Sequence, residues 1–363
     1  MLKILFLLSH QPNPRFVKQI NYLSKNNDVS VLHYFRNYMV DLSNEYNNKT
    51  ILNKSLEAIS NGNYLKRMSV YFKSYSELKK ILEQNSYDIL IVNNIDTLAL
   101  YKISSMFLKA KTKSIVEISD LRGYTYSHSF KSKVMRTIEK FMFKFVDKLI
   151  VTSPKFCDMY YDKFFKGECF LLENKPLSNM VPKKLEKVKN KKVVIGIVGF
   201  LLQGKPYKAL FETIKNDDRY EVHIYGKGVY QNLVEEYATK YKNIKYFGEY
   251  NFFQDSAKIY SSLDILYMPY DTTNGSLNNK IALPNKFYEA MYFQVPIITS
   301  EGTYLGELVE RYNVGLTVKY YCNDSLLKAI RNMYKLTNNF SSLKKNIFLA
   351  DDDYLELESF IES

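Results

Sequence analysis

Residues 283–291 read LPNKFYEAM, and residues 295–300 read VPIITS. The first stretch predicts a proline-led loop that enters a short helix, and the second predicts a buried strand. Lys286 and Glu289 are three residues apart, so both side chains leave the same face of that helix. The free N–H groups at the start of the helix would suit phosphates, and the carboxylate would suit ribose hydroxyls. The alternative is an exposed Lys–Glu pair on an ordinary amphipathic helix.

Apolar runs typical of buried strands alternate with helical segments through the first half of the chain. Strands are expected at residues 3–8, 29–33, 87–92, 114–118 and 148–151. A long polar segment, residues 47–85, is expected to be mostly helical. Because strands alternate with helices, this half predicts a parallel, doubly wound sheet.

The pattern breaks at residues 174–192 and then restarts. Further strands are expected at residues 192–199, 221–226, 244–248, 264–268, 295–299 and 315–318. We therefore predict an α/β protein with two doubly wound Rossmann-like domains facing a central cleft, where the carboxyl ends of both sheets would bind ligands. The predicted parts are an N-terminal domain (1–175), a Lys-rich linker (176–191), a C-terminal domain (192–340) and C-terminal helices (341–363).

The composition is that of a globular protein. Apolar residues make up 46% of the 363 residues, which is enough for a full core. No uncharged apolar run reaches the ~18 residues of a membrane-spanning helix, and residues 1–8 fit a first strand better than a signal peptide. The three cysteines (Cys157, Cys169 and Cys322) are far apart and odd in number, so neither a disulfide nor a zinc site is expected, and a reducing cytosol fits.

The positive charge is concentrated in the first half of the chain. Residues 1–182 hold 27 Lys and Arg against 16 Asp and Glu, a balance of +11 out of a total of +13. Such a balance suits an anionic membrane surface, a phosphorylated acceptor or a nucleic acid. No RNP-like or helix-turn-helix signature supports the nucleic acid. The alternative is a compositional drift towards lysine.

The segment 284–291 with 295–298 resembles the donor-nucleotide motif of bacterial GT-B glycosyltransferases, in particular the retaining family 4 and its surface-polysaccharide branches. The resemblance implies that Glu289 holds the ribose of a nucleotide-sugar and that Lys286 lies near the donor phosphates, with Asn285 in the same motif. Ile281 stands where the family's E-x7-E motif has its first Glu. The chain follows the P-N-K-x-x-E version of some branches instead.

Two glycine-containing turns could approach a donor. Gly199 and Gly204 permit close backbone approach to phosphate, and Lys205 is predicted to stand just before a helix. The resemblance implies that Lys205 grips the diphosphate, with Phe200 in place of a family Arg and Lys286 as the replacement cation. Gly226 falls in a turn that the resemblance places near the base. Ordinary strand-to-helix turns are the alternative for both segments.

In the first domain, Asp120 follows a predicted strand and matches a family Asp. It could bind hydroxyls of the acceptor or the sugar, or it could cap the next helix. His10 lies in the loop after the first strand, where acceptors approach in the family. His128 is a further candidate for the donor sugar, although a lone His in a polar loop is more often structural.

Residues 130–149 combine an apolar stripe with many basic residues. The stripe consists of Phe130, Val134, Ile138, Phe141, Met142 and Phe145. A basic amphipathic helix can lie on anionic lipid. A helix that covers the sheet of its own domain has the same pattern.

These features predict a glycosyltransferase that moves a sugar from a UDP- or GDP-linked donor to a lipid-linked or growing cell-surface glycan, such as capsule or lipopolysaccharide. No D-x-D motif or carboxylate cluster suggests a metal, so the leaving diphosphate would be stabilised by cations, and no cofactor is expected. The resemblance implies retention of configuration and a cytoplasmic or peripheral membrane location. The alternatives are a nucleotide-sugar epimerase on the same fold and a non-catalytic scaffold.

Overall fold

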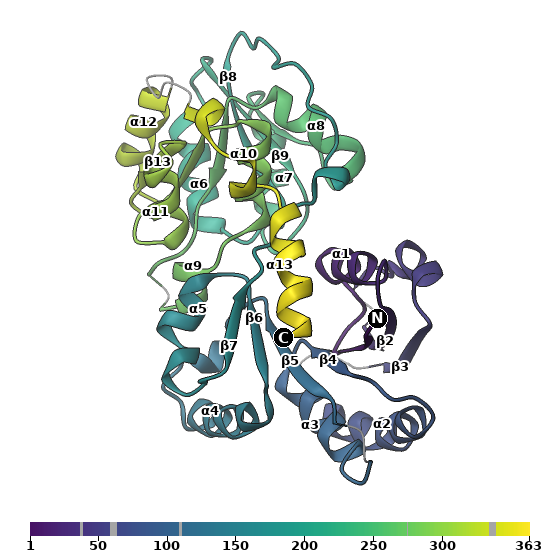
Figure 1. Cartoon of the computed structure of the whole chain (residues 1–363). Helices are drawn as coiled ribbons and strands as arrows, with labels where there is room; N and C mark the ends of the chain where they lie inside the picture. The colour runs from purple at the N-terminus through teal and green to yellow at the C-terminus, as the bar shows by residue number, and fades with distance from the viewer. Residues whose placement is uncertain (37–38, 59–63, 109–110, 274, 334–338) are drawn as a thin grey trace. The chain divides into compact units, whose positions relative to one another are not determined.

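The structure is a computed structural model of the 363-residue chain (Figure 1). It describes residues 1–36, 39–58, 64–108, 111–273, 275–333 and 339–363. The chain forms two compact units. The N-terminal unit consists of Met1–Leu172 with Asp353–Ser363, and the C-terminal unit consists of Glu173–Asp352.

The N-terminal unit is built on a seven-stranded sheet in the order β3-β2-β1-β4-β5-β6-β7. Every neighbouring pair of strands is parallel. The strands are β1 (Lys3–Leu8), β2 (Asp28–Phe35), β3 (Leu52–Ala58), β4 (Ile89–Val92), β5 (Lys113–Ile118), β6 (Lys148–Val151) and β7 (Glu168–Leu171). The central strands β1 and β4 are almost wholly buried, as their continuous apolar runs require.

Helices connect these parallel strands, and local signals fix where several of them start. The helices are α1 (Pro14–Leu23), α2 (Tyr64–Gln84), α3 (Ile95–Ser104), α4 (Phe130–Met142), α5 (Pro154–Met159) and α13 (Asp351–Glu362). Helix α1 begins with Pro14 after Asn13, whose side chain accepts a hydrogen bond from the N–H of Phe16. Helix α13 starts in the C-terminal unit, but from Asp353 onwards it belongs to the N-terminal unit.

The C-terminal unit has a six-stranded sheet in the order β10-β9-β8-β11-β12-β13, which is again parallel throughout. Its strands are β8 (Val193–Val198), β9 (Tyr220–Tyr225), β10 (Ile244–Tyr246), β11 (Ile265–Met268), β12 (Ile297–Ser300) and β13 (Gly315–Val318). Its helices are α6 (Gly204–Ile214), α7 (Gln231–Lys240), α8 (Phe252–Ser262), α9 (Leu277–Ile281), α10 (Asn285–Phe293), α11 (Tyr304–Arg311) and α12 (Asn323–Asn332).

Alternate residues of the strands in the C-terminal unit belong to two separate hydrophobic clusters. On β11, Ile265 and Tyr267 join the cluster that includes residues of α6, α7 and α12. Leu266 and Met268 join the cluster that includes residues of α8, α10 and α11. Since successive side chains of a strand point to opposite faces, helices cover both faces of this sheet, as in a doubly wound fold.

The predicted strands are confirmed, but two edge strands were missed. Strand β3 lies inside the segment 47–85 that was predicted to be mostly helical, and β7 was not predicted. Both are edge strands. Their sequences, LNKSLEA and ECFL, lack the long apolar run that marks the buried strands. Asp96 lies in the first turn of α3, after the N-cap Asn94.

The segment 176–191, predicted as a solvated linker, falls within the C-terminal unit. The N–H of Val188 donates to the carbonyl oxygen of Ser261 at 2.9 Å. The Asn190 side chain donates to the carbonyl oxygen of Ser262 and to the Asp264 carboxylate. These hydrogen bonds tie the end of the segment to helix α8 and the start of β11.

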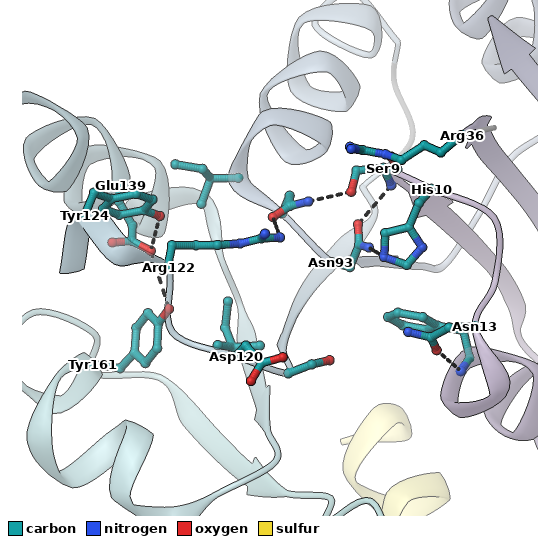
Figure 2. Close-up of a pocket in the computed structure, with 15 residues that line it drawn as sticks. Ser9, His10, Asn13, Arg36, Asn93, Asp120, Arg122, Tyr124, Glu139 and Tyr161 are labelled. Carbon is teal, nitrogen blue, oxygen red and sulfur yellow. Dashed lines mark hydrogen bonds between the residues drawn. The ribbon is translucent and has the colours of Figure 1, made fainter. Parts of the chain in front are cut away.

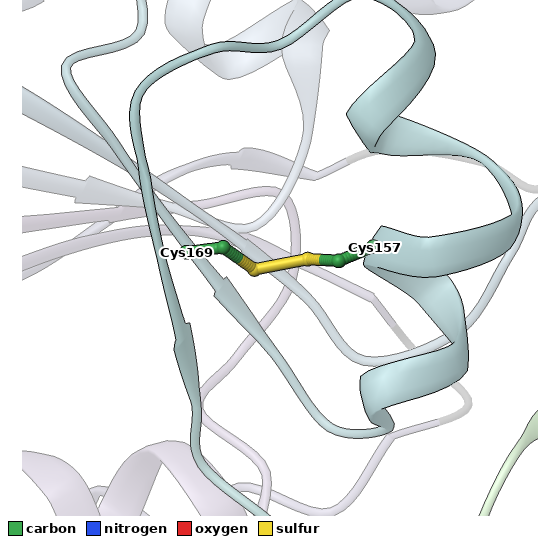
Figure 3. The surroundings of a disulfide bond; sticks show 2 residues. All are labelled: Cys157 and Cys169. Carbon is green, nitrogen blue, oxygen red and sulfur yellow. A yellow bond between two sulfur atoms is a disulfide. The ribbon is translucent and has the colours of Figure 1, made fainter.

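The prediction that the cysteines are unpaired was wrong. Cys157 on α5 and Cys169 on β7 form a disulfide across a sequence separation of 12 residues (Figure 3). Because β7 was not predicted, no pattern in the sequence indicated that this edge strand would lie beside α5. Cys322 is a free thiol. No helix in the described part of the chain is long and apolar enough to cross a membrane.

In both sheets, the direction in which successive strands are added reverses at one place, although all strands are parallel. Counted within each unit, the order is 3-2-1-4-5-6, with a seventh strand added in the N-terminal unit. The reversal lies between β1 and β4 in one unit and between β8 and β11 in the other. Ligands of open α/β sheets bind outside the carboxyl ends of the strands at such a switch point.

Candidate active site

The Lys286–Glu289 pair lies on α10 in the C-terminal unit, and both side chains are largely buried. The Lys286 ammonium lies 2.9 and 2.8 Å from the two Glu289 carboxylate oxygens. The Tyr260 hydroxyl on α8 donates to Glu289 Oε2 at 2.8 Å. The exposed side-chain fractions are 20% for Lys286 and 7% for Glu289, so the alternative of an exposed surface pair was wrong.

Electrostatics keep Lys286 protonated. Burial alone would lower the pKa of Lys286, but the Glu289 carboxylate outweighs it, and the pKa of Lys286 is raised. Burial, reinforced by the same carboxylate, raises the pKa of Tyr260 well above its usual value, so Tyr260 remains a hydrogen-bond donor. The Lys286 ammonium also lies 5.3 Å from the centre of the Tyr250 ring, within the range of a cation–π contact.

The Glu289 carboxylate can still accept further hydrogen bonds. An ionised carboxylate offers about four lone-pair positions, and Lys286 and Tyr260 use three of them. Ribose hydroxyls could use what remains. The charge of Lys286, in contrast, is already compensated by Glu289, so Lys286 offers less to a diphosphate than an unpaired lysine would.

A pair of glycines holds the loops after β8 and β9 against α10. Gly199 has a φ of +112°, and a Cβ there would lie 3.1 Å from Lys286 Cε. Gly226 has a φ of +126°, and a Cβ there would lie 1.9 Å from the carbonyl oxygen of Gly199. Both positions therefore need glycine for backbone conformation and close packing. They bring Gly199, Gly226, Lys286 and Glu289 together at the carboxyl end of the sheet.

Gly204 and Lys205 form the start of α6. A Cβ on Gly204 would lie 2.2 Å from the Tyr230 ring, so packing against this ring accounts for that glycine. Lys205 lies in the first turn of α6 rather than before it, and its side chain is exposed. Its ammonium lies 5.6 Å from the centre of the Tyr321 ring. The helix has no side-chain cap, which leaves its first N–H groups for other acceptors.

Asn285 begins α10, next to Lys286. Its side-chain oxygen accepts a hydrogen bond from Asn174 in the same unit. No side chain caps α10, whose N-cap residue is Pro284. The starts of α6 and α10, like those of α7 and α12 in this unit, thus lack side-chain caps. Ile281, which replaces the first family Glu, is buried in the hydrophobic core at the end of α9.

The N-terminal unit has a polar cavity of about 240 Å³ at its own switch point (Figure 2). Most of its lining comes from the loops that follow β1, β2, β4 and β5. The polar side chains among these loops are Ser9, His10, Asn13, Arg36, Asn93, Asn94, Ser119, Asp120 and Arg122. The structure therefore places Asp120 and His10 in one cavity, whereas His128 does not line it.

Hydrogen bonds connect the two central loops of this cavity. The Asn93 amide nitrogen lies 2.9 Å from His10 Nε2, and His10 Nδ1 lies 2.7 Å from the carbonyl oxygen of Gln11. Asn93 offers a donor and Gln11 an acceptor, so only the imidazole with its proton on Nδ1 satisfies both contacts. Burial lowers the pKa of His10, which favours this neutral form. Arg122 donates to the Asn94 side-chain oxygen at 2.6 Å.

Glu139 of α4 lines the cavity together with Tyr124 and Tyr161. Its carboxylate accepts hydrogen bonds from the hydroxyls of Tyr124, Tyr160 and Tyr161. Burial raises the pKa of Glu139, although the three hydroxyls act in the opposite direction. Helix α4 is capped by Ser129, which accepts from the N–H of Ser132, so the alternative role of Asp120 as its cap is wrong.

Sequence reasoning missed several residues of both sites. Tyr260 lies 29 residues before Glu289, and no local pattern marks it. Arg36, Asn93, Asn94 and Arg122 share one signal that was available, since each is a polar residue just after a buried strand. In the described parts of the chain, no group of three or more His, Cys, Asp or Glu side chains is placed to hold a metal ion.

Comparisons with known proteins agree with the fold. Residues 192–335 match the family described as "Glycosyl transferases group 1". The chain is similar to the lipopolysaccharide outer core galactosyltransferase WaaB, with 13% identity, 98% coverage of both chains and a TM-score of 0.71. It is also similar to HepE from Anabaena in complex with UDP, with 14% identity, coverage of 99% and 100%, and a TM-score of 0.72. No curated protein matches the chain in sequence.

The same fold is also found in a different class of enzyme. A putative UDP-N-acetylglucosamine 2-epimerase from Listeria monocytogenes is 10% identical, with coverage of 100% and 96% and a TM-score of 0.65. The likeness in structure shows the fold alone, and the family match distinguishes the two classes. The segment that matches contains Gly199, Lys205, Lys286 and Glu289. Residues 192–335 thus match the glycosyl transferases group 1 family, and the chain as a whole has the GT-B fold of its structural neighbours.

Proposed function

We propose that this glycosyltransferase takes a sugar from a uridine diphosphate sugar and moves it to a lipid-linked or growing cell-surface glycan. The observation that carries the proposal is the buried Lys286–Glu289–Tyr260 cluster beside the Gly199 turn. A buried, ionised carboxylate with spare acceptor capacity suits the paired hydroxyls of a ribose. HepE, with the same fold, has been solved with UDP and with UDP-glucose, which favours uridine over guanosine.

Each donor residue has a distinct part in this proposal. Glu289 accepts the ribose hydroxyls, and Lys286 with Tyr260 holds its carboxylate in place. The exposed Lys205 and the uncapped starts of α6 and α10 face the diphosphate, where N–H groups and a cation stabilise negative charge. Gly199 lets the backbone approach the diphosphate closely, and Gly226 packs against the carbonyl oxygen of Gly199.

The reaction proposed for this site retains configuration and needs no metal, as the family 4 resemblance implies. The bond between the sugar C1 and the phosphate oxygen breaks, and a new bond from C1 to the acceptor oxygen forms on the same face. The acceptor proton moves to the departing phosphate oxygen, so no protein base is required. The developing charge on the diphosphate is stabilised by Lys205 and backbone N–H groups.

The acceptor belongs, in this proposal, to the polar cavity of the N-terminal unit. Its amide, hydroxyl and guanidinium groups can donate hydrogen bonds to sugar hydroxyls, and Asp120 can accept them. WaaB is a galactosyltransferase of the lipopolysaccharide outer core, which supports a surface glycan as the acceptor class. We place the reaction on the cytoplasmic side, at the inner face of the cell membrane.

A thermal-shift panel with UDP, GDP, ADP, CMP and TDP, each with Mg²⁺ and with EDTA, tests the donor site. A ligand at ~100 times its Kd adds ~2.7 kcal/mol to stability, which raises the melting temperature by a few degrees. We expect a selective shift with UDP that survives EDTA. A shift with GDP alone would show that the donor carries guanine rather than uracil. No shift with any nucleotide would favour a non-catalytic scaffold.

The epimerase alternative predicts a different product. An epimerase would equilibrate a UDP-sugar with its isomer in the absence of any acceptor, whereas a transferase would leave the sugar unchanged or hydrolyse it slowly. NMR of the recovered UDP-sugar distinguishes these outcomes. The match of residues 192–335 to group 1 transferases is the observation that favours transfer.

A further inference from the structure

Helix α4, at the lower left of Figure 1, exposes an apolar side and buries polar residues, and the exposed Phe145 of the short helix η4 (Phe143–Phe145) continues this apolar side. The buried residues of α4 are Ser132 and Glu139. The exposed apolar residues are Phe130 (82%), Val134 (42%), Ile138 (45%), Phe141 (55%) and Phe145 (44%). At 3.6 residues per turn these five span an arc of only about 80°. A surface helix normally has the opposite orientation, with its apolar stripe towards the sheet.

Polar contacts fix this orientation. The buried Glu139 carboxylate accepts from three tyrosine hydroxyls. Arg136 donates to the carbonyl oxygens of Tyr124 and Ser127. Rotating α4 to bury its apolar stripe would break these contacts and leave a buried carboxylate without partners, which is costly. The alternative that the stripe covers the sheet of its own domain was therefore wrong.

Lysines flank the exposed apolar stripe. Lys131, Lys133, Lys140 and Lys144 are all exposed. The Lys144 ammonium lies 5.8 Å from the centre of the Phe141 ring, which shows that a lysine can extend along the stripe. The acidic residue of α4, Glu139, points inward, so its charge does not oppose the lysines. We call this surface, consisting of the five apolar residues and the four lysines, the α4 face.

We propose that the α4 face docks on an anionic lipid bilayer. Its aromatic and aliphatic side chains would enter the boundary of the acyl region, and its lysines would reach the anionic headgroups. The +11 balance of residues 1–182 adds a longer-range attraction of the same sign. Helix α3, which contacts α4, also exposes Ile103, and Met106 and Phe107 are exposed just beyond its end.

A second copy of the chain is a poorer occupant. In a symmetric dimer through this face, residues of one copy meet the same patch on the other copy. The four lysines of each copy would then face one another without an exposed acidic residue of α4 between them. A bilayer rich in anionic lipid supplies the missing negative charge. This inference does not depend on the donor site in the C-terminal unit.

The absence of tryptophan from the sequence gives a clean probe of this face. We would introduce single tryptophans as Phe141→Trp on α4 and, as a matched control, Phe72→Trp on α2, where Phe72 is 75% exposed. Each protein is mixed with vesicles of phosphatidylcholine alone or with about 30% phosphatidylglycerol, made with and without brominated acyl chains. We expect a blue shift and bromine quenching for the tryptophan at position 141, only with the anionic vesicles, and neither change at position 72.

Two variants separate the apolar and the electrostatic contributions in a vesicle co-sedimentation experiment. Ile138→Ser with Phe141→Ser should weaken binding to anionic vesicles at least tenfold, whereas Phe72→Ser should leave it unchanged. Lys140→Gln with Lys144→Gln should weaken binding by roughly 10-fold to 30-fold at low salt, since each lysine near the surface contributes ~1 kcal/mol. Because all these side chains are exposed, the variants should fold normally, which circular dichroism checks.

Three outcomes would overturn the inference. One is equal binding to neutral and anionic vesicles, and another is binding that the α4 variants do not change. The third is a stable dimer in solution that Phe141→Ser dissociates, which would make the α4 face an interface between copies. Sugar transfer to a soluble acceptor should be the same for these variants and the wild type, so a failure of the donor proposal would be seen separately.

Discussion

The two units place a switch point at the same position of the same strand order, but they surround it with different chemistry. In the C-terminal unit the surroundings are two glycine turns, two uncapped helix starts and one ionised Lys–Glu pair. In the N-terminal unit they are a cavity lined by His, Asn, Arg and Asp side chains. The comparison teaches that topology decides where a ligand can bind, while the residue types decide which ligand it is.

The buried lysines of the two units show the same contrast. In the C-terminal unit, Lys286 contacts the Glu289 carboxylate, and the pKa of Lys286 is raised. Burial lowers the pKa of Lys18 in the N-terminal unit to about 7; the nearby Arg15 acts in the same direction, and Glu117 and Asp353 oppose it. A buried lysine therefore stays a cation in one unit, whereas the buried lysine of the other unit loses its proton around neutral pH.

The largest expected effect is the loss of donor turnover when Glu289, at the switch point of the C-terminal unit, is replaced. Replacing Glu289 by Ala should lower kcat/KM for the UDP-sugar by roughly 10-fold to 150-fold, because a hydrogen bond from a ribose hydroxyl to a charged acceptor contributes about 1.5–3 kcal/mol. Steady-state kinetics with varied donor measures this. Glu289→Gln should recover folding but not activity, since the amide keeps the shape and loses the charge that Lys286 needs.

The matched control for this experiment is Glu236→Ala, because Glu236 is exposed on α7 and pairs with Lys240. It should leave the kinetics unchanged. Glu289→Ala also removes the partner of a buried lysine, which costs about 3–5 kcal/mol of stability, so folding must be checked first. If folded Glu289→Gln turned over the donor at the wild-type rate, the proposed binding of ribose by Glu289 would be wrong.

The second prediction concerns the disulfide in the N-terminal unit. Replacing Cys157 and Cys169 by Ala should destabilise this unit by up to about 3 kcal/mol, from the loop-closure entropy of a loop of this length. Hydrogen exchange of each unit measures the effect separately, which avoids treating two units as one two-state transition. Reductant should reproduce the loss because Cys169 is exposed. Cys322→Ala in the C-terminal unit is the control, and equal loss of protection in both units would contradict the prediction.

The third prediction is a pH dependence of the N-terminal unit that depends on Lys18. The pKa of Lys18 is about 7 in the folded state and near 10.5 in the unfolded state, so between these values the unfolded state binds one more proton. The stability of this unit should therefore rise from about pH 7.5 to about pH 9.5, by an amount on the order of 2 kcal/mol. Hydrogen exchange, corrected for the intrinsic exchange rate, measures it.

The contribution of Lys286 to stability depends on pH with the opposite sign. Because its folded pKa is raised above 10.5, its stabilising contribution is fully present below the unfolded pKa and is lost only as the pH rises through the folded value. The C-terminal unit should thus gain nothing from Lys286 over the same pH range. Lys18→Met should flatten the pH profile of the N-terminal unit, and a slope that survives this change would show that Lys18 is not its cause.

The sequence predicts the central parts of this molecule better than its edges. Continuous apolar runs mark the buried strands, and the spacing of Lys286 and Glu289 places both on one helix face. Strands β3 and β7 lie at sheet edges, where polar residues are tolerated and the apolar signal is lost. The Cys157–Cys169 disulfide was missed for the same reason, since it joins β7 to α5.

Other features depend on contacts that no local pattern contains. The hydrogen bond from Tyr260 to Glu289 forms only when α8 packs beside α10. The periodicity of α4 defines an apolar stripe but not the face that turns inward, because either face can be buried if its groups find partners. In this protein Glu139 finds three tyrosine hydroxyls from other segments, and these long-range contacts decide the orientation.

The smallest expected effect tests the cavity of the N-terminal unit. Arg122 is exposed, and it donates to the Asn94 side chain at the rim of the two central loops. Replacing it by Ala removes a donor to acceptor hydroxyls and lets Asn94 move, so KM for the acceptor should rise about tenfold, which corresponds to the ~1.4 kcal/mol of one hydrogen bond from a charged group. Arg219→Ala in the C-terminal unit, an exposed arginine paired with Asp217, is the matched control. The UDP-induced thermal shift and the slow hydrolysis of donor without acceptor should stay at wild-type values in both variants. If Arg122→Ala instead weakens UDP binding and leaves acceptor KM unchanged, the two switch points do not divide donor from acceptor, and the cavity of the N-terminal unit would have to be reassigned to the donor.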